Sequence, residues 1–183
     1  VDEGDSRSAV ELLGEAKYRI FDALVETDGY SFIAVGRPET AGCYCKINSY
    51  LKEVIAILSN EFDYVVIDGE AGIEQINRRV MEKVTHLLLI TDPSRKGCQV
   101  INTIKSVADE LVMYDKIGAI VNRMADETLK EYINTNGIEV ISYIADDKNL
   151  SMFDIQGENI FNLPAESNVV NGVKNALNRI GVI

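Results

Sequence analysis

Apolar and polar residues follow one another along this chain in blocks that predict strands and helices in turn. Short apolar runs bounded by glycine, proline or acidic residues predict strands. Apolar residues that recur at the i, i+3, i+4, i+7 spacing predict helices. The expected strands cover residues 30–35, 64–68, 85–91, 117–121 and 138–144, and the expected helices cover residues 47–60, 74–83, a long segment opened by Asp92-Pro93-Ser94, 126–134 and 168–179. Before residue 30 the pattern predicts only the end of a strand, an acidic loop and a short helix that ends at Gly14.

This order of elements predicts a doubly wound, mainly parallel α/β sheet with helices on both faces. The run Tyr64-Val65-Val66-Ile67 contains no polar break before Asp68, which is typical of a central parallel strand buried on both faces. No linker, repeat or low-complexity segment interrupts the pattern, so we expect one domain over residues 1–183. Ligands of such sheets bind at the carboxyl ends of the strands, and the polar residues there are the candidates for function.

The charge balance bears on the partners. Lys and Arg together number 18 against 29 Asp and Glu, which gives a formal net charge of −11. Nucleic acids and anionic membranes attract cationic surfaces, so we expect neither as a partner. The longest apolar run, around Leu87-Leu88-Leu89-Ile90, is too short to span a bilayer. Three cysteines and no visible signal peptide are typical of a cytoplasmic protein.

Two of the three cysteines form the motif Gly42-Cys43-Tyr44-Cys45, between an expected strand and an expected helix. Two thiols this close can share one soft metal ion, form a strained redox-active disulfide, or simply remain free. Zinc takes four ligands, commonly in a tetrahedron, and nickel with thiolates also accepts four. No other residue of the chain obviously supplies the missing two. A second copy of the loop across a two-fold axis would complete a four-thiolate nickel or zinc site in a homodimer.

Further candidates follow other expected strands. Asp68 and Gly72 have the form of an acid that orients magnesium and a glycine whose N–H approaches a terminal phosphate. Asn122 carries a carboxamide that can both donate to and accept from a purine edge. Asp2 and Asp5 can hold a water molecule or a metal ion. The structural alternative is that these are ordinary loop and helix-capping residues.

The chain contains no Gly-x-x-x-x-Gly-Lys-Ser/Thr motif, the glycine-rich loop that cradles a triphosphate. The stretch from Gly36 to Gly42 has the wrong spacing and no following Lys-Ser/Thr pair. These residues therefore do not themselves predict a triphosphate site.

The motifs taken together resemble the CooC family. The resemblance rests on Gly42-Cys43-Tyr44-Cys45 and on the run Val66-Ile67-Asp68-Gly69-Glu70-Ala71-Gly72-Ile73-Glu74, and it continues through Thr91-Asp92-Pro93-Ser94-Arg95, Asn122-Arg123 and Ile144-Ala145-Asp146. CooC proteins are MinD-like and nitrogenase-iron-protein-like ATPases that serve nickel insertion into carbon monoxide dehydrogenase. The resemblance spans nearly the whole chain and implies a P-loop NTPase-like fold of the SIMIBI type.

The resemblance also implies partners and roles. It implies ATP or ADP with Mg, nickel or zinc held by a homodimer, and carbon monoxide dehydrogenase as the client enzyme. It assigns the switch and magnesium-side roles to Asp2, Asp5, Asp68 and Gly72, nucleotide contacts to Asn122, Arg123 and Ala145, and metal ligation to Cys43 and Cys45.

In this family the chain start, Val1-Asp2, matches the end of the second strand. The resemblance thus implies that the first strand, the phosphate loop and the first helix precede residue 1, and that the sheet of residues 1–183 is incomplete at its N-terminal end. We accordingly expect no ATP hydrolysis by these 183 residues alone.

Two other functions fit parts of the pattern. A MinD/ParA-like positioning ATPase would share the fold, with the cysteines present by chance. The expected final helix carries only Lys174 and Arg179, however, and so lacks a basic amphipathic face for a membrane. A phospho-receiver domain would use Asp2 and Glu3 as its acid pair and Asp68 as the acceptor, but no lysine follows the next strand in the required place.

Overall fold

The computed structural model describes residues 22–34, 44–69 and 83–183. The chain divides into two compact units, Val1–Asp68 and Gly69–Ile183. In unit 1, β1 (Val25–Thr27) and β2 (Tyr30–Phe32) form an antiparallel hairpin, and α2 spans Tyr44–Glu61. In the part of α2 whose side chains are described, Val54 and Leu58 are buried, with Leu24, Ile33 and Ile57 packed against them.

In unit 1 the strand predicted at 30–35 is the shorter β2. It pairs with β1, a strand that the sequence pattern did not predict. Thr27 pairs with Tyr30 across the two residues Asp28 and Gly29, and Gly29 has a φ of +95°. An Asp-Gly pair favours such a two-residue hairpin because glycine accepts a positive φ without a steric cost. The turn signal was present in the sequence, within a segment whose apolar pattern is irregular.

The predicted strand at 64–68 is wrong. Residues 64–69 are described and adopt no strand, and the two-stranded sheet of unit 1 consists of β1 and β2. The side chain of Val66 is 94% exposed. A strand requires a neighbouring strand for its backbone hydrogen bonds, and among the described residues none pairs with this run. Asp68 therefore does not follow a strand in this structure.

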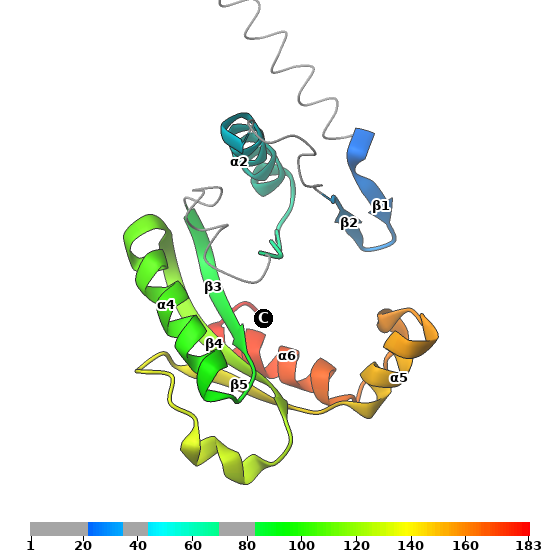
Figure 1. Cartoon of the computed structure of the whole chain (residues 1–183). Coiled ribbons are helices and arrows are strands. Elements are labelled where there is room, and N and C mark those ends of the chain that lie inside the picture. The colour runs from blue at the N-terminus through cyan, green and yellow to red at the C-terminus, as the bar shows by residue number, and fades with distance from the viewer. Residues whose placement is uncertain (1–21, 35–43, 70–82) are drawn as a thin grey trace, which may run out of the picture. The chain divides into compact units, whose positions relative to one another are not determined.

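Unit 2 contains a parallel sheet of three strands in the order β3-β4-β5 (Figure 1). The bounds are Lys83–Thr91 for β3, Met113–Met124 for β4 and Val140–Ala145 for β5. Helix α4 (Arg95–Leu111) connects β3 to β4, and α6 (Asn168–Ile180) is the last helix. The smaller elements are η1 (Glu127–Tyr132), α5 (Lys148–Gln156) and η2 (Ile160–Asn162).

The prediction of a parallel, doubly wound α/β fold is confirmed in unit 2, because α4 and α6 cover opposite faces of the sheet (Figure 1). Each face has its own apolar cluster. The buried residues are Leu89, Ile101, Ala119 and Ile138 on the α4 side, and Ile120, Ile141, Ile144, Ala176 and Ile180 on the α6 side.

Several boundaries in unit 2 differ from the predicted ones. The helix predicted at 126–134 is the short 3-10 helix η1, and the predicted loop after residue 144 contains α5 and η2. The helix predicted at 74–83 lies outside the described residues except for Lys83, which begins β3. No helix among the described residues has the length and apolar content needed to cross a membrane.

Helix α6 lies unusually close to β5. A Cβ atom at Gly172 would lie 2.5 Å from Cγ1 and 2.9 Å from Cδ1 of Ile144. The hydroxyl of Ser142 donates a buried hydrogen bond of 2.8 Å to the carbonyl oxygen of Gly172. The absent side chain at Gly172 thus allows both the apolar contact and the hydrogen bond that join α6 to the sheet.

We predict that Gly172→Val lowers the free energy of unfolding by about 2 kcal/mol, because the added side chain overpacks the contact with Ile144. Urea unfolding followed by circular dichroism measures the change. Lys174→Val, at an exposed position of the same helix, is the control and costs only the lower helix propensity of valine, about 0.5 kcal/mol. Equal losses in the two variants would contradict a tight contact at Gly172.

Candidate functional site at the carboxyl end of the sheet

The end of β3 is joined to the start of α4 by a fixed carboxylate. Oδ1 of Asp92 accepts a 2.9 Å hydrogen bond from the backbone N–H of Ser94, whose own hydroxyl oxygen accepts from the N–H of Gly97 at 2.9 Å. Hydrogen bonds from Ser94 lower the pKa of the Asp92 carboxyl, and the charge of Arg123 adds to this. A Cβ atom at Gly97 would lie 2.5 Å from Oδ1 of Asp92, so glycine keeps this approach open. The first turn of α4 is thereby capped at the carboxyl end of the sheet.

The end of β4 carries Asn122 and Arg123. Oδ1 of Asn122 accepts a 2.9 Å hydrogen bond from the backbone N–H of Arg123, and Arg123 has a φ of +59°. Few residues other than glycine adopt this left-handed conformation, which costs energy and is found more often at functional sites. Among the described residues, Nδ2 of Asn122 makes no hydrogen bond, so its donors are available to a ligand.

The end of β5 lies beside the end of β4. Ala145 is the register partner of Met124, and the N–H of Asp146 donates to the carbonyl oxygen of Met124 at 3.1 Å. Residues 122 and 123 immediately precede Met124. The structure thus brings the predicted nucleotide-contacting residues Asn122, Arg123 and Ala145 to adjoining strand ends. Their role in binding nucleotide stays a prediction.

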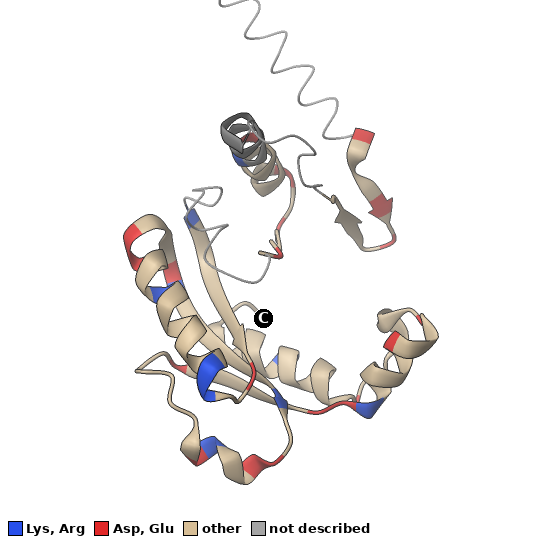
Figure 2. Ribbon diagram, in the orientation of Figure 1, with Lys and Arg blue, Asp and Glu red and all other residues tan. Residues whose placement is uncertain are grey.

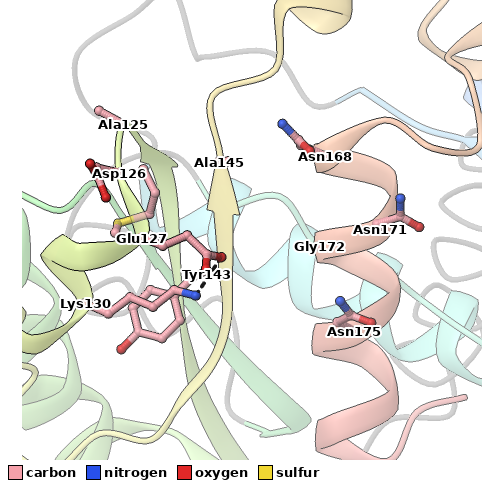
Figure 3. Close-up of a pocket in the computed structure, with 11 residues that line it drawn as sticks. Ala125, Asp126, Glu127, Lys130, Tyr143, Ala145, Asn168, Asn171, Gly172 and Asn175 are labelled. Atoms are coloured by element: carbon pink, nitrogen blue, oxygen red, sulfur yellow. Dashed lines mark hydrogen bonds and ion pairs between the residues drawn. The ribbon is translucent and has the colours of Figure 1, made fainter.

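A pocket of about 240 Å³ opens beside these strand ends (Figure 3). Its lining comes from the end of β4, from η1, from β5 and from α6. The residues are Met124, Ala125, Asp126, Glu127, Lys130, Tyr143, Ala145, Asn168, Asn171, Gly172 and Asn175. Of the residues predicted from the sequence, Ala145 is the one in this lining. Lys130 makes a 2.9 Å salt bridge with Glu127 and its Nζ lies 5.2 Å from the centre of the Tyr143 ring.

Asp147 holds the loop after β5 in place. Its Oδ1 accepts from the N–H groups of Asn149 and Leu150, which begin α5, and its Oδ2 accepts from the N–H of Val169 in the first turn of α6. The hydroxyl of Ser167 donates to the same Oδ2. These bonds, with that from Ser167 as the largest contribution, hold the pKa of the Asp147 carboxyl below its ordinary value. One carboxylate thus caps two helices.

The remaining predicted site residues lie in unit 1 or outside the described residues. Asp2, Asp5, Gly72 and Cys43 lie outside the described residues, and Cys45 is the second residue of α2, with its side chain outside the description. Asp68 lies in unit 1, on an exposed segment. Among the described residues no group of three or more His, Cys, Asp or Glu side chains is placed to hold a metal ion. The magnesium and nickel or zinc sites therefore stay predictions.

The sequence pattern predicted the helix α6, but it did not identify the asparagines of this helix or Asp147 as residues of a site. The signal for α6 was the recurrence of asparagine at positions 168, 171 and 175, which places three carboxamides on neighbouring positions of one helix. The signal for Asp147 was an acidic residue before a segment of helix-forming residues. The asparagine spacing and the acidic residue do not identify a site by themselves, because the site forms only where α6 packs beside β5.

The sequence of this chain is similar to those of several known proteins. It is 32% identical over 184 residues to an uncharacterised ATP-binding protein of Methanocaldococcus jannaschii, MJ0685, which covers 98% of this chain and 73% of that protein. It is 22% identical to the septum site-determining protein MinD of Bacillus subtilis and 26% identical to the carbon monoxide dehydrogenase accessory protein CooC of Rhodospirillum rubrum. These matches cover 80% and 72% of this chain, and 58% and 54% of the relatives. No protein-family model matches the chain.

Solved structures agree on the fold. The cell division ATPase MinD of Pyrococcus furiosus superimposes with a TM-score of 0.66 at 18% identity, covering 88% of this chain and 70% of that one. A ParA family ATPase of Chlorobium tepidum gives a TM-score of 0.64 at 19% identity, covering 91% and 73%. By its match to MJ0685 the chain belongs to a family of ATP-binding proteins, and its fold is that of the MinD/ParA-like P-loop ATPases. Within it, the likeness to CooC is a distant one, and the chain spans little more than half the length of that relative.

We predict that Asp147→Asn lowers the free energy of unfolding by about 1–2 kcal/mol at pH 7, because the amide keeps one acceptor but loses the charge that strengthens the capping bonds. The pKa of Asp147 is lowered from 3.8 in the folded protein. Its contribution is therefore complete above about pH 4 and is lost as the pH falls through the folded value. The difference between the two proteins should shrink in acid, as measured by urea unfolding from pH 7 to pH 3.

Asp154→Asn provides the control for this prediction. Asp154 is exposed on α5, and its side chain makes no hydrogen bond among the described residues. Its replacement should leave the free energy of unfolding unchanged at both ends of the pH range. A pH-independent loss in Asp147→Asn would contradict a role for the charge.

Proposed function

We propose that this protein is a nucleotide-dependent metallochaperone that binds nickel, or zinc in its place, through Cys43 and Cys45 and delivers nickel to carbon monoxide dehydrogenase. The observation that carries the proposal is the Cys-x-Cys motif of Cys43 and Cys45 in a chain with the MinD/ParA-like fold; Cys45 lies in the first turn of α2. The distant likeness to the accessory protein CooC of Rhodospirillum rubrum supports the same client. Adjacent thiols are uncommon by chance in a cysteine-poor chain, and thiolates are ligands that suit nickel and zinc.

The metal would be shared by two copies of the chain. Two thiolates leave a four-coordinate ion incomplete, and a two-fold axis through the ion supplies the same two ligands again. Nickel is here the cargo of the protein. Binding and hydrolysis of ATP would change the geometry of the shared thiolates and so release the ion to the client.

The nucleotide part of the proposal rests on the carboxyl end of the sheet. Asn122, Arg123 and Ala145 lie on adjoining strand ends, and the unused donors of the Asn122 carboxamide suit the edge of an adenine ring. MJ0685 is named an ATP-binding protein, which supports the same ligand. Asp68, with Asp2 and Asp5, would act on the magnesium side, and Gly72 on the terminal phosphate. The nucleotide would supply binding energy that differs between two arrangements of the dimer.

A MinD-like positioning ATPase is the second candidate, and it is favoured by the relatives and structures named MinD. Such a protein would need a surface that binds a membrane or a polymer. The charged residues of α6 are Lys174 and Arg179 (Figure 2). The Cys-x-Cys motif has a role in the metal-handling function and none in positioning, so we place the metal-handling function first.

We predict one nickel or zinc ion per two chains, and loss of both the metal and the metal-dependent dimer in Cys43→Ser/Cys45→Ser, because the two thiols of each chain form half of the site. Metal analysis and light scattering of the same samples measure the two quantities. Unchanged metal stoichiometry in the double variant would rule out this site.

Cys98→Ser is the matched control, since it removes the third thiol from a buried position on α4. Burial raises the pKa of the Cys98 thiol, which opposes the thiolate form that metals bind. This variant should keep the metal stoichiometry of the original chain.

We predict that Asn122→Asp weakens binding of ADP about tenfold, the cost of about one hydrogen bond and an added negative charge at the purine. The carboxylate can still accept from the N–H of Arg123, so the local turn should persist. Isothermal titration calorimetry measures the affinity. In Asn134→Asp, the control, the side-chain oxygen can likewise still accept from the N–H of Asn136, and ADP affinity should stay the same. Equal affinities in all three proteins would remove Asn122 from the nucleotide site.

A further inference from the structure

The outer edge of β5 carries backbone groups that face away from the described sheet. The strand order β3-β4-β5 leaves β5 at one side, and no described strand lies beyond it. The N–H of Asp146 donates to Met124 of β4. Since successive residues of a strand direct their backbone groups to opposite sides, those of Ala145 and of Tyr143, two residues earlier, face the outer side. An edge of this kind is a template for another strand.

The pocket lies along this outer edge. Tyr143 and Ala145 are the two residues of β5 that line it, and both have outward backbone groups. The lining continues on one side of β5 with Lys130 of η1 and on the other side with α6 (Figure 3). The pocket thus opens over the edge of the strand, with side chains from both neighbouring elements.

The side chains that α6 contributes match a peptide backbone. Asn168, Asn171 and Asn175 line the pocket (Figure 3). Nδ2 of Asn168 donates to the carbonyl oxygen of Asp146 at 2.9 Å, while the carboxamides of Asn171 and Asn175 make no hydrogen bond among the described residues. A carboxamide carries one acceptor and two donors, the same kinds of group as a peptide unit. These two side chains can therefore bind the backbone of a segment that lies along β5.

The charges of the lining argue against an anionic ligand. Its cation, Lys130, is engaged by Glu127 at 2.9 Å and by the ring of Tyr143. Asp126 and Glu127 leave the lining with one more negative than positive charge. The whole chain has a formal charge of −11, which adds to the repulsion of acidic partners.

We propose that this pocket binds an extended segment of a protein partner, which adds as a strand to the outer edge of β5 and whose backbone is held by Asn171 and Asn175. The segment is neutral or basic. Backbone pairing along the edge provides affinity, and the carboxamides and acids of the pocket select the segment. The proposal does not depend on the metal or nucleotide functions proposed above.

The test uses the complete chain and random ten-residue peptides displayed on phage. We expect enrichment of peptides that lack Asp and Glu, and binding of a synthetic copy of the most enriched one in a calorimeter. Asn171→Ala/Asn175→Ala should weaken this binding about tenfold or more, the effect of losing two hydrogen bonds. Asn178→Ala, on the same helix but outside the pocket, should bind as the original chain does.

Backbone methylation of the peptide tests strand pairing directly. Methyl groups on the N–H groups of alternate residues remove either the bonds that face β5 or those that face away from it. One methylated set should lose binding and the other should retain it. Equal binding of the two methylated sets would overturn the proposal. So would an unchanged affinity in Asn171→Ala/Asn175→Ala, or a failure to enrich any peptide.

Two further measurements separate this proposal from the proposed function. Cys43→Ser/Cys45→Ser should bind the peptide with unchanged affinity, since positions 43 and 45 are not among the residues that line the pocket. Asn171→Ala/Asn175→Ala, which should lose the peptide, should keep the ADP affinity of the original chain, because neither asparagine belongs to the proposed nucleotide site. Loss of both the peptide and ADP in this variant would assign the pocket to the nucleotide and overturn the peptide site.

Discussion

The close approach of α6 to β5 is the constraint on which the carboxyl end of the sheet depends. It exists because Gly172 has no side chain to meet Ile144, and because Ser142 satisfies the carbonyl oxygen of Gly172 inside the contact. A larger residue would move the helix away from the strand. The polar positions of α6 would then no longer lie beside the ends of β4 and β5, and the pocket would lose one of its sides.

The loop after β5 joins the end of this strand to the first turns of α5 and α6. Asp147 accepts hydrogen bonds from the first turns of both α5 and α6, and it follows directly after the strand end that carries Ala145. Asp92 has a similar position after β3, where it accepts from Ser94 at the start of α4. Asp147 is thus a helix cap, whereas Asp92 orders the turn that places Ser94, the N-cap of α4. The lowered pKa values of both carboxyls follow from their hydrogen bonds, first of all those with Ser94 and Ser167, so they require no catalytic explanation.

Much of unit 2 was predictable from the sequence. The apolar runs that became β3, β4 and β5 are separated by amphipathic segments, and alternation of this kind has few solutions other than a parallel sheet. The run at 64–68 has the same composition and is not a strand, because pairing depends on a neighbour and not on composition. The position of Asn122 and Arg123 at a strand end was likewise predictable, but the positive φ of Arg123 was not.

By itself, the sequence determined the order of β3, α4, β4, β5 and α6, the acidic character of the chain and the pair of cysteines, since these follow from residue identity and spacing. Tertiary structure alone decided which residues meet. Asn171 and Asn175 lie about thirty residues after Tyr143 and Ala145, and only the contact at Gly172 places them at one strand edge. Local periodicity reports which face of an element is apolar, whereas the neighbour of that face depends on packing between distant segments.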